Sequence, residues 1–317
     1  RDTMNTGHDE ILELVKEKST TGEIYYNSRI LMQFKNSEIE DIIKNKSGNN
    51  YTASLQLFST EHKNLALNHT IEVHSLAQSW NEGTGRYNNL PTSSNGSSWE
   101  YTDNSTTKTP WQTSSFDVDK TGNGSLVNGG GHWYTNYTGS QTFSNASNLD
   151  TNINVTTLVD IISQSIFSGG NIHNNGFIVK KPEATEMDGS SSYGELKYFS
   201  VDTHTIYPPI LAFKWDDSVH AKQGSAKQEG ELNVSLYRNK EKFNKNEEAT
   251  FRIHVRDKYP TRTFSTSSNY LDAGYFTTGS YYSIRDAATE DVIIPFDDSC
   301  TKLSADNEGM YFKIYMN

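Results

Sequence analysis

Short segments in which apolar and polar residues alternate recur along the whole chain. In residues 52–58, Ala53, Leu55 and Leu57 alternate with polar side chains, and residues 70–77 repeat the pattern. A period of two is typical of a strand with one buried face and one face in water. The pattern therefore predicts an all-β protein built mainly from antiparallel sheets. Further strands are expected at 28–34, 176–181, 194–202, 208–215, 231–237 and 248–256.

Two segments show helical periodicity instead. Residues 37–46 begin with the Ser and Glu spacing of a capping box, and their isoleucines fall on one helical face. Residues 155–170 carry an apolar stripe, with Thr157 expected as the capping residue and Gly169 as the end of the helix. The sequence therefore predicts two short helices within the β protein.

Residues 81–151 are dominated by Gly, Asn, Ser and Thr, which indicates long polar loops. Trp80 and Trp99 bracket the first of these loops, which also carries Glu82 and Arg86. Loop aromatics either stack on sugars or cover the open edge of a sandwich. We expect the two tryptophan rings to pack over a sandwich edge, with Glu82 and Arg86 bonded to loop backbone or to each other.

The composition changes after residue 217, which divides the chain into two expected domains. Residues 1–217 hold the first domain, and residues 218–230 are small, charged and almost free of aromatics, as in a linker. Residues 231–317 contain short, regularly spaced strand patterns without a helix signal, which predicts a small immunoglobulin-like sandwich. The chain stops within a strand pattern, so we expect this sandwich to be incomplete at its C-terminal end.

Charge and composition narrow the classes of partner. The net charge is −11 at pH 7, and the Lys and Arg residues are scattered, so no nucleic-acid partner is expected. No apolar run approaches the roughly 18 residues of a membrane span. A single cysteine, Cys300, excludes a disulfide within the chain and has no histidine near it in sequence.

Candidate chemistry is weak. Four loop or strand carboxylates could in principle perform glycoside hydrolysis, namely Glu82, Asp117, Asp119 and Glu195. Residues 116–125 begin like a calcium loop, but Asn128 stands where the bidentate Glu should be. The nine histidines lack zinc-site spacing, and nucleotide-binding and serine-nucleophile motifs are missing. We therefore expect no catalytic, cofactor-binding or metal-binding residues and no enzymatic activity.

The order of several short motifs resembles a known module. The sequence departs from that module at two positions: Asn154 stands where the module usually has Asp, and Val201 interrupts its usual Ser-Arg-Asp or Ser-Arg-Glu run. The matching pieces, within residues 1–217, are MNTGHDEILEL, NSRILMQF, TASLQLF, QSWNEGTG, NGSSWEY, TPW, NVTTLVDII, NNGFIVK and LKYFSVDTHTIYPPILAFKW. Together they resemble the DNRLRE-type jelly-roll β-sandwich of bacterial surface and phage virion proteins. The resemblance implies a jelly-roll first domain.

The whole chain is similar to structural proteins of large contractile-tailed marine bacteriophages. The pieces that carry this similarity beyond the first domain are RDKYPTRTF, SSNYL, SYYSIRDA and IIPFDD. The resemblance implies a virion component of the tail, neck or fibre apparatus, with other virion proteins and copies of itself as partners. The alternative is a carbohydrate-binding adhesion module that contacts host glycans, for which two or more coplanar exposed aromatics in 81–151 would be the mark.

Overall fold

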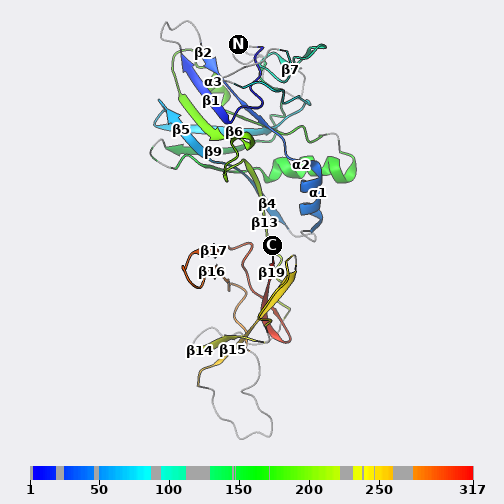
Figure 1. Cartoon of the computed structure of the whole chain (residues 1–317), viewed down its shortest axis with the longest axis vertical. Coiled ribbons are helices and arrows are strands. Elements are labelled where there is room, and N and C mark those ends of the chain that lie inside the picture. The colour runs from blue at the N-terminus through cyan, green and yellow to red at the C-terminus, as the bar shows by residue number, and fades with distance from the viewer. Residues whose placement is uncertain are drawn as a thin grey trace. The chain divides into compact units, whose positions relative to one another are not determined.

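The protein divides into two compact units in a computed structural model of the chain (Figure 1). The first unit comprises Arg1–Asn45 and Thr52–Phe213, and the second comprises Lys46–Tyr51 and Lys214–Asn317. The structure describes residues 3–18, 25–45, 50–86, 94–111, 129–144, 146, 148–170, 172–221, 231–237, 239–245, 247–259 and 274–316. These residues form a mostly β protein with several sheets, as the sequence predicts.

Antiparallel sheets build the first unit. Their orders are β2-β1-β12-β5, β3-β11-β6-β9 and β10-β4-β13, and β7 pairs with β8. The strands are β1 (Ile11–Lys18), β2 (Tyr25–Asn27), β3 (Ile30–Met32), β4 (Tyr51–Leu57), β5 (Ser59–Lys63), β6 (Asn68–Ser75), β7 (Tyr101–Asp103), β8 (Thr109–Pro110), β9 (Gly139–Ser144), β10 (Thr151–Asn154), β11 (Phe177–Lys180), β12 (Gly194–Phe199) and β13 (Ile210–Trp215).

The buried faces of the strands are the ones that the alternation of apolar and polar residues predicts. Ala53, Leu55 and Leu57 on β4 and Ile71 and Val73 on β6 are fully buried, while the residues between them are partly exposed. Strand β11 differs, because all four of its residues are buried. Pairing with β3 on one side and β6 on the other places β11 inside its sheet.

Three helices occur among the described residues, one more than the sequence predicts. Both expected helices are present as α1 (Asn36–Asn45) and α2 (Thr156–Ser168), which lie side by side (Figure 1). The third, α3 (Glu183–Glu186), is a single turn after Pro182 and is too short to leave a periodic pattern. A 3₁₀ turn spans Val201–Thr203.

The ends of α2 match the prediction at one terminus only. Gly169 ends the helix in the left-handed conformation, with φ of 68°, as expected. Thr157 does not cap the helix, because α2 begins one residue earlier, at Thr156. The side chain of Asn154 instead accepts a hydrogen bond of 3.0 Å from the Thr156 N–H.

The second unit is a smaller antiparallel assembly. Its main sheet has the order β14-β15-β19-β18, and β16 pairs with β17. Its core contains Val255, Tyr275, Leu303, Ala305 and Met310. The strands are β14 (Leu232–Leu236), β15 (Glu248–Asp257), β16 (Ile284–Arg285), β17 (Val292–Ile294), β18 (Ser304–Asp306) and β19 (Gly309–Tyr315).

The structure describes only residues 218–221 of the expected linker, and these belong to the second unit. The Ala305 N–H donates to the Val219 carbonyl at 2.9 Å, and the Ala221 N–H donates to the Ala305 carbonyl at 2.8 Å. Residues 222–230 lie outside the described residues. None of the helices formed by the described residues has the length and apolar character needed to cross a membrane.

Candidate functional site

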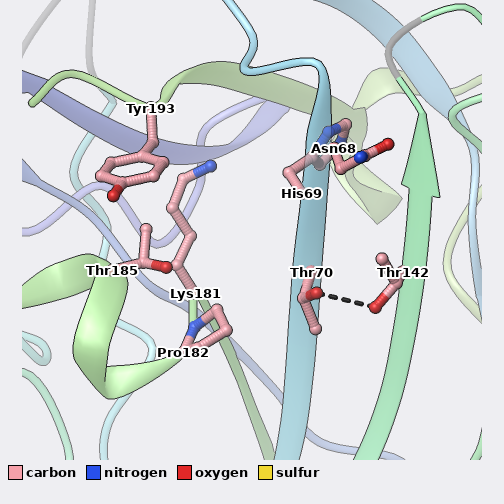
Figure 2. A pocket seen from close by; sticks show the side chains of 8 residues that line it. All are labelled: Asn68, His69, Thr70, Thr142, Lys181, Pro182, Thr185 and Tyr193. Atoms are coloured by element: carbon pink, nitrogen blue, oxygen red, sulfur yellow. Dashed lines mark hydrogen bonds between the residues drawn. The ribbon is translucent and has the colours of Figure 1, made fainter.

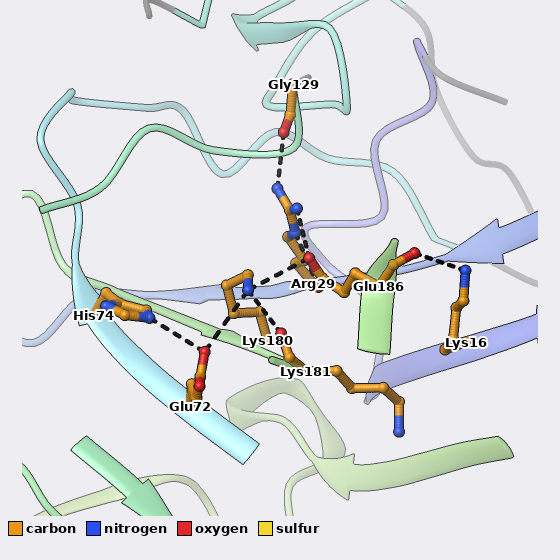
Figure 3. Close-up of polar contacts among 8 residues, drawn as sticks. All are labelled: Lys16, Arg29, Glu72, His74, Gly129, Lys180, Lys181 and Glu186. Carbon is orange, nitrogen blue, oxygen red and sulfur yellow. Dashed lines mark hydrogen bonds and ion pairs between the residues drawn. The ribbon is translucent and has the colours of Figure 1, made fainter. Parts of the chain in front are cut away.

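Six charged side chains gather in the first unit; five of them are buried in its interior, where charged groups are rare, and the sixth, Glu72, is partly buried. They come from β1, the approach to β3, β6, the end of β11 and α3, and Figure 3 shows that the Lys181 side chain runs away from the contacts that the others form. We call this group the buried charge cluster; it consists of Lys16, Arg29, Glu72, Lys180, Lys181 and Glu186.

Glu186 is the centre of the buried charge cluster. Its carboxylate accepts two hydrogen bonds from Arg29, of 2.7 and 3.2 Å, and lies 3.4 Å from the Lys180 ammonium. Its backbone carbonyl accepts a hydrogen bond of 2.7 Å from the Lys16 ammonium. A buried carboxylate is tolerated only when it is paired in this way.

Aromatic rings hold the guanidinium of Arg29 in place. The guanidinium carbon lies 4.6 Å from the centre of the Trp99 ring and 4.8 Å from that of Trp133. The same group donates a hydrogen bond of 2.8 Å to the Gly129 carbonyl. Trp99 thus packs on a buried cation, which gives this loop aromatic a structural role.

Lys180 occupies the other side of Glu186. Its ammonium donates to the Lys181 carbonyl at 2.7 Å and also lies 3.9 Å from the Glu72 carboxylate. Burial lowers the pKa of Lys180, although the nearby carboxylates oppose the change. The pKa of Glu72 is lowered chiefly by its hydrogen bond with His74.

Lys181 differs from the other members of the buried charge cluster. Its side chain is buried, and its ammonium has no hydrogen-bond partner among the described residues. Burial lowers the pKa of Lys181 from its ordinary 10.5 to about 8, partly offset by Glu186. In Figure 3 no contact line reaches this ammonium.

A pocket of about 140 Å³ lies beside Lys181. Its lining comes from β6, β9, the β11–α3 connection, α3 and the turn before β12, as Figure 2 shows. The lining residues are Asn68, His69, Thr70, Thr142, Lys181, Pro182, Thr185 and Tyr193. The lining is therefore mostly polar, but the Lys181 ammonium and the ring nitrogens of His69 are themselves buried.

The neutral groups of the pocket are partly fixed by bonds to one another and to their surroundings. The Thr70 and Thr142 hydroxyls lie 2.7 Å apart across the β6–β9 pair. The Tyr193 hydroxyl donates to Asp188 at 2.8 Å. Burial and the neighbouring Lys181 lower the pKa of His69 to about 4, so its imidazole is neutral at pH 7.

Of the four carboxylates considered for glycoside hydrolysis, the two that the structure describes, Glu82 and Glu195, lie on separate elements. Glu195 is on β12 and forms an ion pair of 3.0 Å with Lys197. Glu82 is exposed in the loop that follows β6. Asp117, Asp119 and the calcium-like segment 116–125 lie outside the described residues, as does Asn128. Cys300 is exposed in a turn, where its N–H donates to Asp297.

The loop tryptophans pack inward, as expected for Trp80. Leu76, Trp111, Trp133 and Ile178 form a buried cluster, and Trp80 packs against it. The Trp80 indole N–H also donates a hydrogen bond of 2.9 Å to the Asn175 carbonyl. These contacts assign the rings a packing role within the first unit.

Asn5 rather than Glu82 or Arg86 organises the loop between the two tryptophans. The Asn5 amide donates to the carbonyls of Glu82 at 2.7 Å and Ser97 at 2.8 Å. Its side-chain oxygen accepts from the N–H groups of Gly7 and Gly85. The Glu82 and Arg86 side chains were expected to bond to loop backbone or to each other, but both are exposed, and neither forms a hydrogen bond or ion pair with another described residue.

The buried charge cluster leaves little trace in the sequence. Its clearest trace is the segment GFIVKK at 176–181, where two lysines directly continue an apolar strand.

Among the described residues, no group of three or more His, Cys, Asp or Glu side chains is arranged to hold a metal ion. The chain matches no protein-family model, no curated protein and no solved structure.

Proposed function

We propose that the chain is a structural, non-enzymatic component of a bacteriophage virion, in the tail, neck or fibre apparatus. It assembles through contacts with other virion proteins and with copies of itself. In this proposal the first unit is a jelly-roll sandwich and the second is immunoglobulin-like. Two four-stranded antiparallel sheets in the first unit support the jelly-roll assignment, because that fold is built from two such sheets.

An apolar surface on β14 that none of the described residues covers is the observation that carries the proposal. Strand β14 is an outer strand of its sheet, and Val234 and Leu236 lie opposite Val255 and Ile253 of β15. Directly opposed residues share one face of a sheet. Val255 is fully buried and Ile253 packs against the core, yet Val234 is 53% exposed and Leu236 is 64% exposed.

The sheet face that forms the core of the second unit therefore extends onto β14, where none of the described residues covers it. Exposed apolar outer strands pair readily with another chain, which supplies both backbone hydrogen bonds and burial of the side chains. An assembled particle would use such a strand as a contact surface. Weak contacts of this kind become stable when closed symmetry repeats them.

The aromatic side chains of the first unit favour assembly over glycan binding. The described aromatics within 81–151 are all buried or partly buried. A sugar-stacking platform needs aromatic faces open to solvent. The adhesion alternative thus receives no support from these rings.

The experiment compares two double variants of β14. Val234→Lys with Leu236→Lys places charges on the apolar face, whereas Asn233→Lys with Ser235→Lys alters exposed residues of the same strand on its other face. We expect only the first pair to reduce self-association in sedimentation velocity and incorporation into phage particles. Equal behaviour of the two variants, or particles that never contain the chain, would refute the assembly role.

A further inference from the structure

The backbone of β14 turns one set of hydrogen-bonding groups away from its own sheet. At the two ends of the strand, the Lys258 N–H donates to the Glu231 carbonyl at 2.8 Å, and the Tyr237 N–H donates to the Arg252 carbonyl at 2.9 Å. Successive residues of an antiparallel pair bond alternately towards and away from the partner strand, so the odd-numbered residues of β14 bond to β15. The residues whose N–H and carbonyl groups point to the other side are Leu232, Val234 and Leu236.

The opposite edge of the same sheet is closed within the chain. Residues 219–221 bond to the backbone of Ala305 along the outer side of β18. Among the described residues, β14 is therefore the edge of this sheet that stays open. An open, apolar edge strand is a template for pairing with another strand.

The sequence of β14 is nearly symmetric about Val234. Its two neighbours, Asn233 and Ser235, are both small and polar, and the next residue on each side is leucine, at positions 232 and 236. A second copy of β14 that runs antiparallel, with Val234 opposite itself, thus matches apolar with apolar residues and polar with polar residues. The strand is in this sense complementary to itself.

The outward backbone groups have the phase that self-pairing needs. Leu232 lies opposite Leu236 of the second copy, and Val234 lies opposite itself, so the opposed residues are those whose backbone groups point outward. Each such pair exchanges two hydrogen bonds, which gives about six across the junction. Opposed residues also share a face, so the exposed apolar side chains of both copies cover one another.

The charges on the other face of the sheet are compatible with this pairing. Glu231 lies opposite Tyr237 of the second copy and keeps its ion pair of 2.8 Å with Lys258. Asn233 lies opposite Ser235 of the second copy. Within residues 231–237, no like charges therefore meet across the junction, where they would weaken the pair.

We propose that two copies of the chain associate through β14, which pairs with itself antiparallel about Val234. The junction joins two four-stranded sheets into one continuous sheet. Such a contact is isologous, so it closes as a dimer and does not grow into a fibre. This inference rests on the proposed function, because it names a second copy of the chain as the neighbour that covers β14.

Site-directed disulfides in the full chain test the register. Cys300 is exposed and is first replaced by Ser, so that each variant carries a single new cysteine. Opposed residues of a hydrogen-bonded pair have Cα atoms about 5.5 Å apart, which a disulfide can span. We expect oxidation of Val234→Cys to give a covalently linked dimer.

Leu232→Cys and Leu236→Cys are the matched controls on the same face of the strand. In the proposed pair, each residue lies about 13 Å along the strand from the same residue of the second copy, so neither variant should link to itself. A mixture of the two should give linked dimers, because the two positions are opposed. Self-linkage of Leu236→Cys at the yield of Val234→Cys, or no linkage in the mixture, would overturn the register.

A proline tests the backbone contribution separately. Val234→Pro removes an N–H that points away from β15, which spares pairing within the chain, whereas Val234→Ile keeps both that N–H and an apolar side chain. In sedimentation equilibrium, we expect the natural protein and Val234→Ile to dimerise alike and Val234→Pro to dimerise about tenfold more weakly or worse. A natural protein that stays monomeric, or undiminished dimerisation of Val234→Pro, would overturn self-pairing.

The virion role and the self-pairing fail in different ways. Dimers with the expected register, in a chain that no particle contains, would support self-pairing and refute the virion role. Particles in which a different protein covers β14 would support the virion role and refute self-pairing.

Discussion

The guanidinium of Arg29 holds the carboxylate of Glu186 by two hydrogen bonds, and both side chains are almost completely buried. The two residues are 157 positions apart in the sequence. Their pairing therefore fixes the approach to β3 against α3 inside the first unit. Removing one partner of a buried ion pair destabilises a protein far more than replacing both partners with well-packed apolar residues.

Substitution of Glu186 tests the importance of this pairing. Glu186→Gln removes the carboxylate that Arg29 and Lys180 share, and both cations stay buried. We expect the free energy of unfolding to fall by about 3 to 5 kcal/mol, the usual cost of leaving a buried charge without its partner. Urea denaturation followed by circular dichroism measures the change.

Glu183→Gln is the matched control for this substitution. Glu183 lies on the same short helix, but its side chain is exposed. We expect a change within about 0.5 kcal/mol, as for most surface substitutions. Equal losses of unfolding free energy in Glu186→Gln and Glu183→Gln would show that the pairing of Glu186 with Arg29 and Lys180 does not stabilise the fold.

Removal of the Lys181 charge should have the opposite effect on stability. Burial holds the pKa of Lys181 at about 8, against an ordinary value of 10.5. This difference corresponds to about 3 kcal/mol of destabilisation at pH 7. We therefore expect Lys181→Met to raise the free energy of unfolding by about 2 to 3 kcal/mol, whereas Lys63→Met, at an exposed position, should change it little.

The same pKa predicts how the gain depends on pH. Between pH 8 and 10.5 the unfolded chain binds more protons at Lys181 than the folded chain does, so the natural protein gains stability as pH rises. The advantage of Lys181→Met should therefore shrink across this range and vanish above it. Other groups near Lys181, namely Glu186, His69, Tyr193 and Lys180, are present in both proteins. A constant difference from pH 7 to 10.5 would contradict the account.

Two tryptophans should differ in their contribution to stability. Trp133 is buried and lies over Arg29, so Trp133→Ala should cost about 3 to 5 kcal/mol. Trp80 is only partly buried, and Trp80→Ala should cost about 2 kcal/mol through lost packing and its bond to Asn175. Thermal or urea unfolding gives the ranking, which a larger loss at Trp80 would reverse.

Asn5 should be essential to the loop between the two tryptophans. Asn5→Ala removes two donors and an oxygen that accepts two hydrogen bonds. We expect a loss of about 3 kcal/mol, because several backbone groups are left without partners. Asn136→Ala, at an exposed position, is the control. Faster amide exchange at Gly85 in Asn5→Ala alone would confirm the local cause.

The sequence predicts those strands and helices that bury one face, because their apolar residues then recur with a regular period. Ala53, Leu55 and Leu57 alternate because β4 has one buried side, and α2 shows a helical stripe for the same reason. Strand β9 carries no such pattern, since Phe143 and Gly139 are its only buried residues. Its pairing with β6, which is distant in sequence, determines that it forms a strand.

The buried charge cluster was beyond sequence reasoning for a related reason. Lysine is normally a surface residue, so the sequence alone places Lys180 and Lys181 at the exposed end of a strand and not in the interior. Their burial depends on Glu186 and Arg29, which reach them only through the tertiary fold. No local pattern records a partner at that separation, and the pocket beside Lys181 is likewise formed by residues from five segments of the chain.

We propose a virion role for the chain, and a density map of the intact phage particle tests this proposal most directly. The account predicts defined copies of the chain in the tail, neck or fibre apparatus, with Val234 and Leu236 of β14 covered by a neighbouring subunit. Complete particles that contain no copy of the chain, or copies with β14 fully open to solvent, would contradict it.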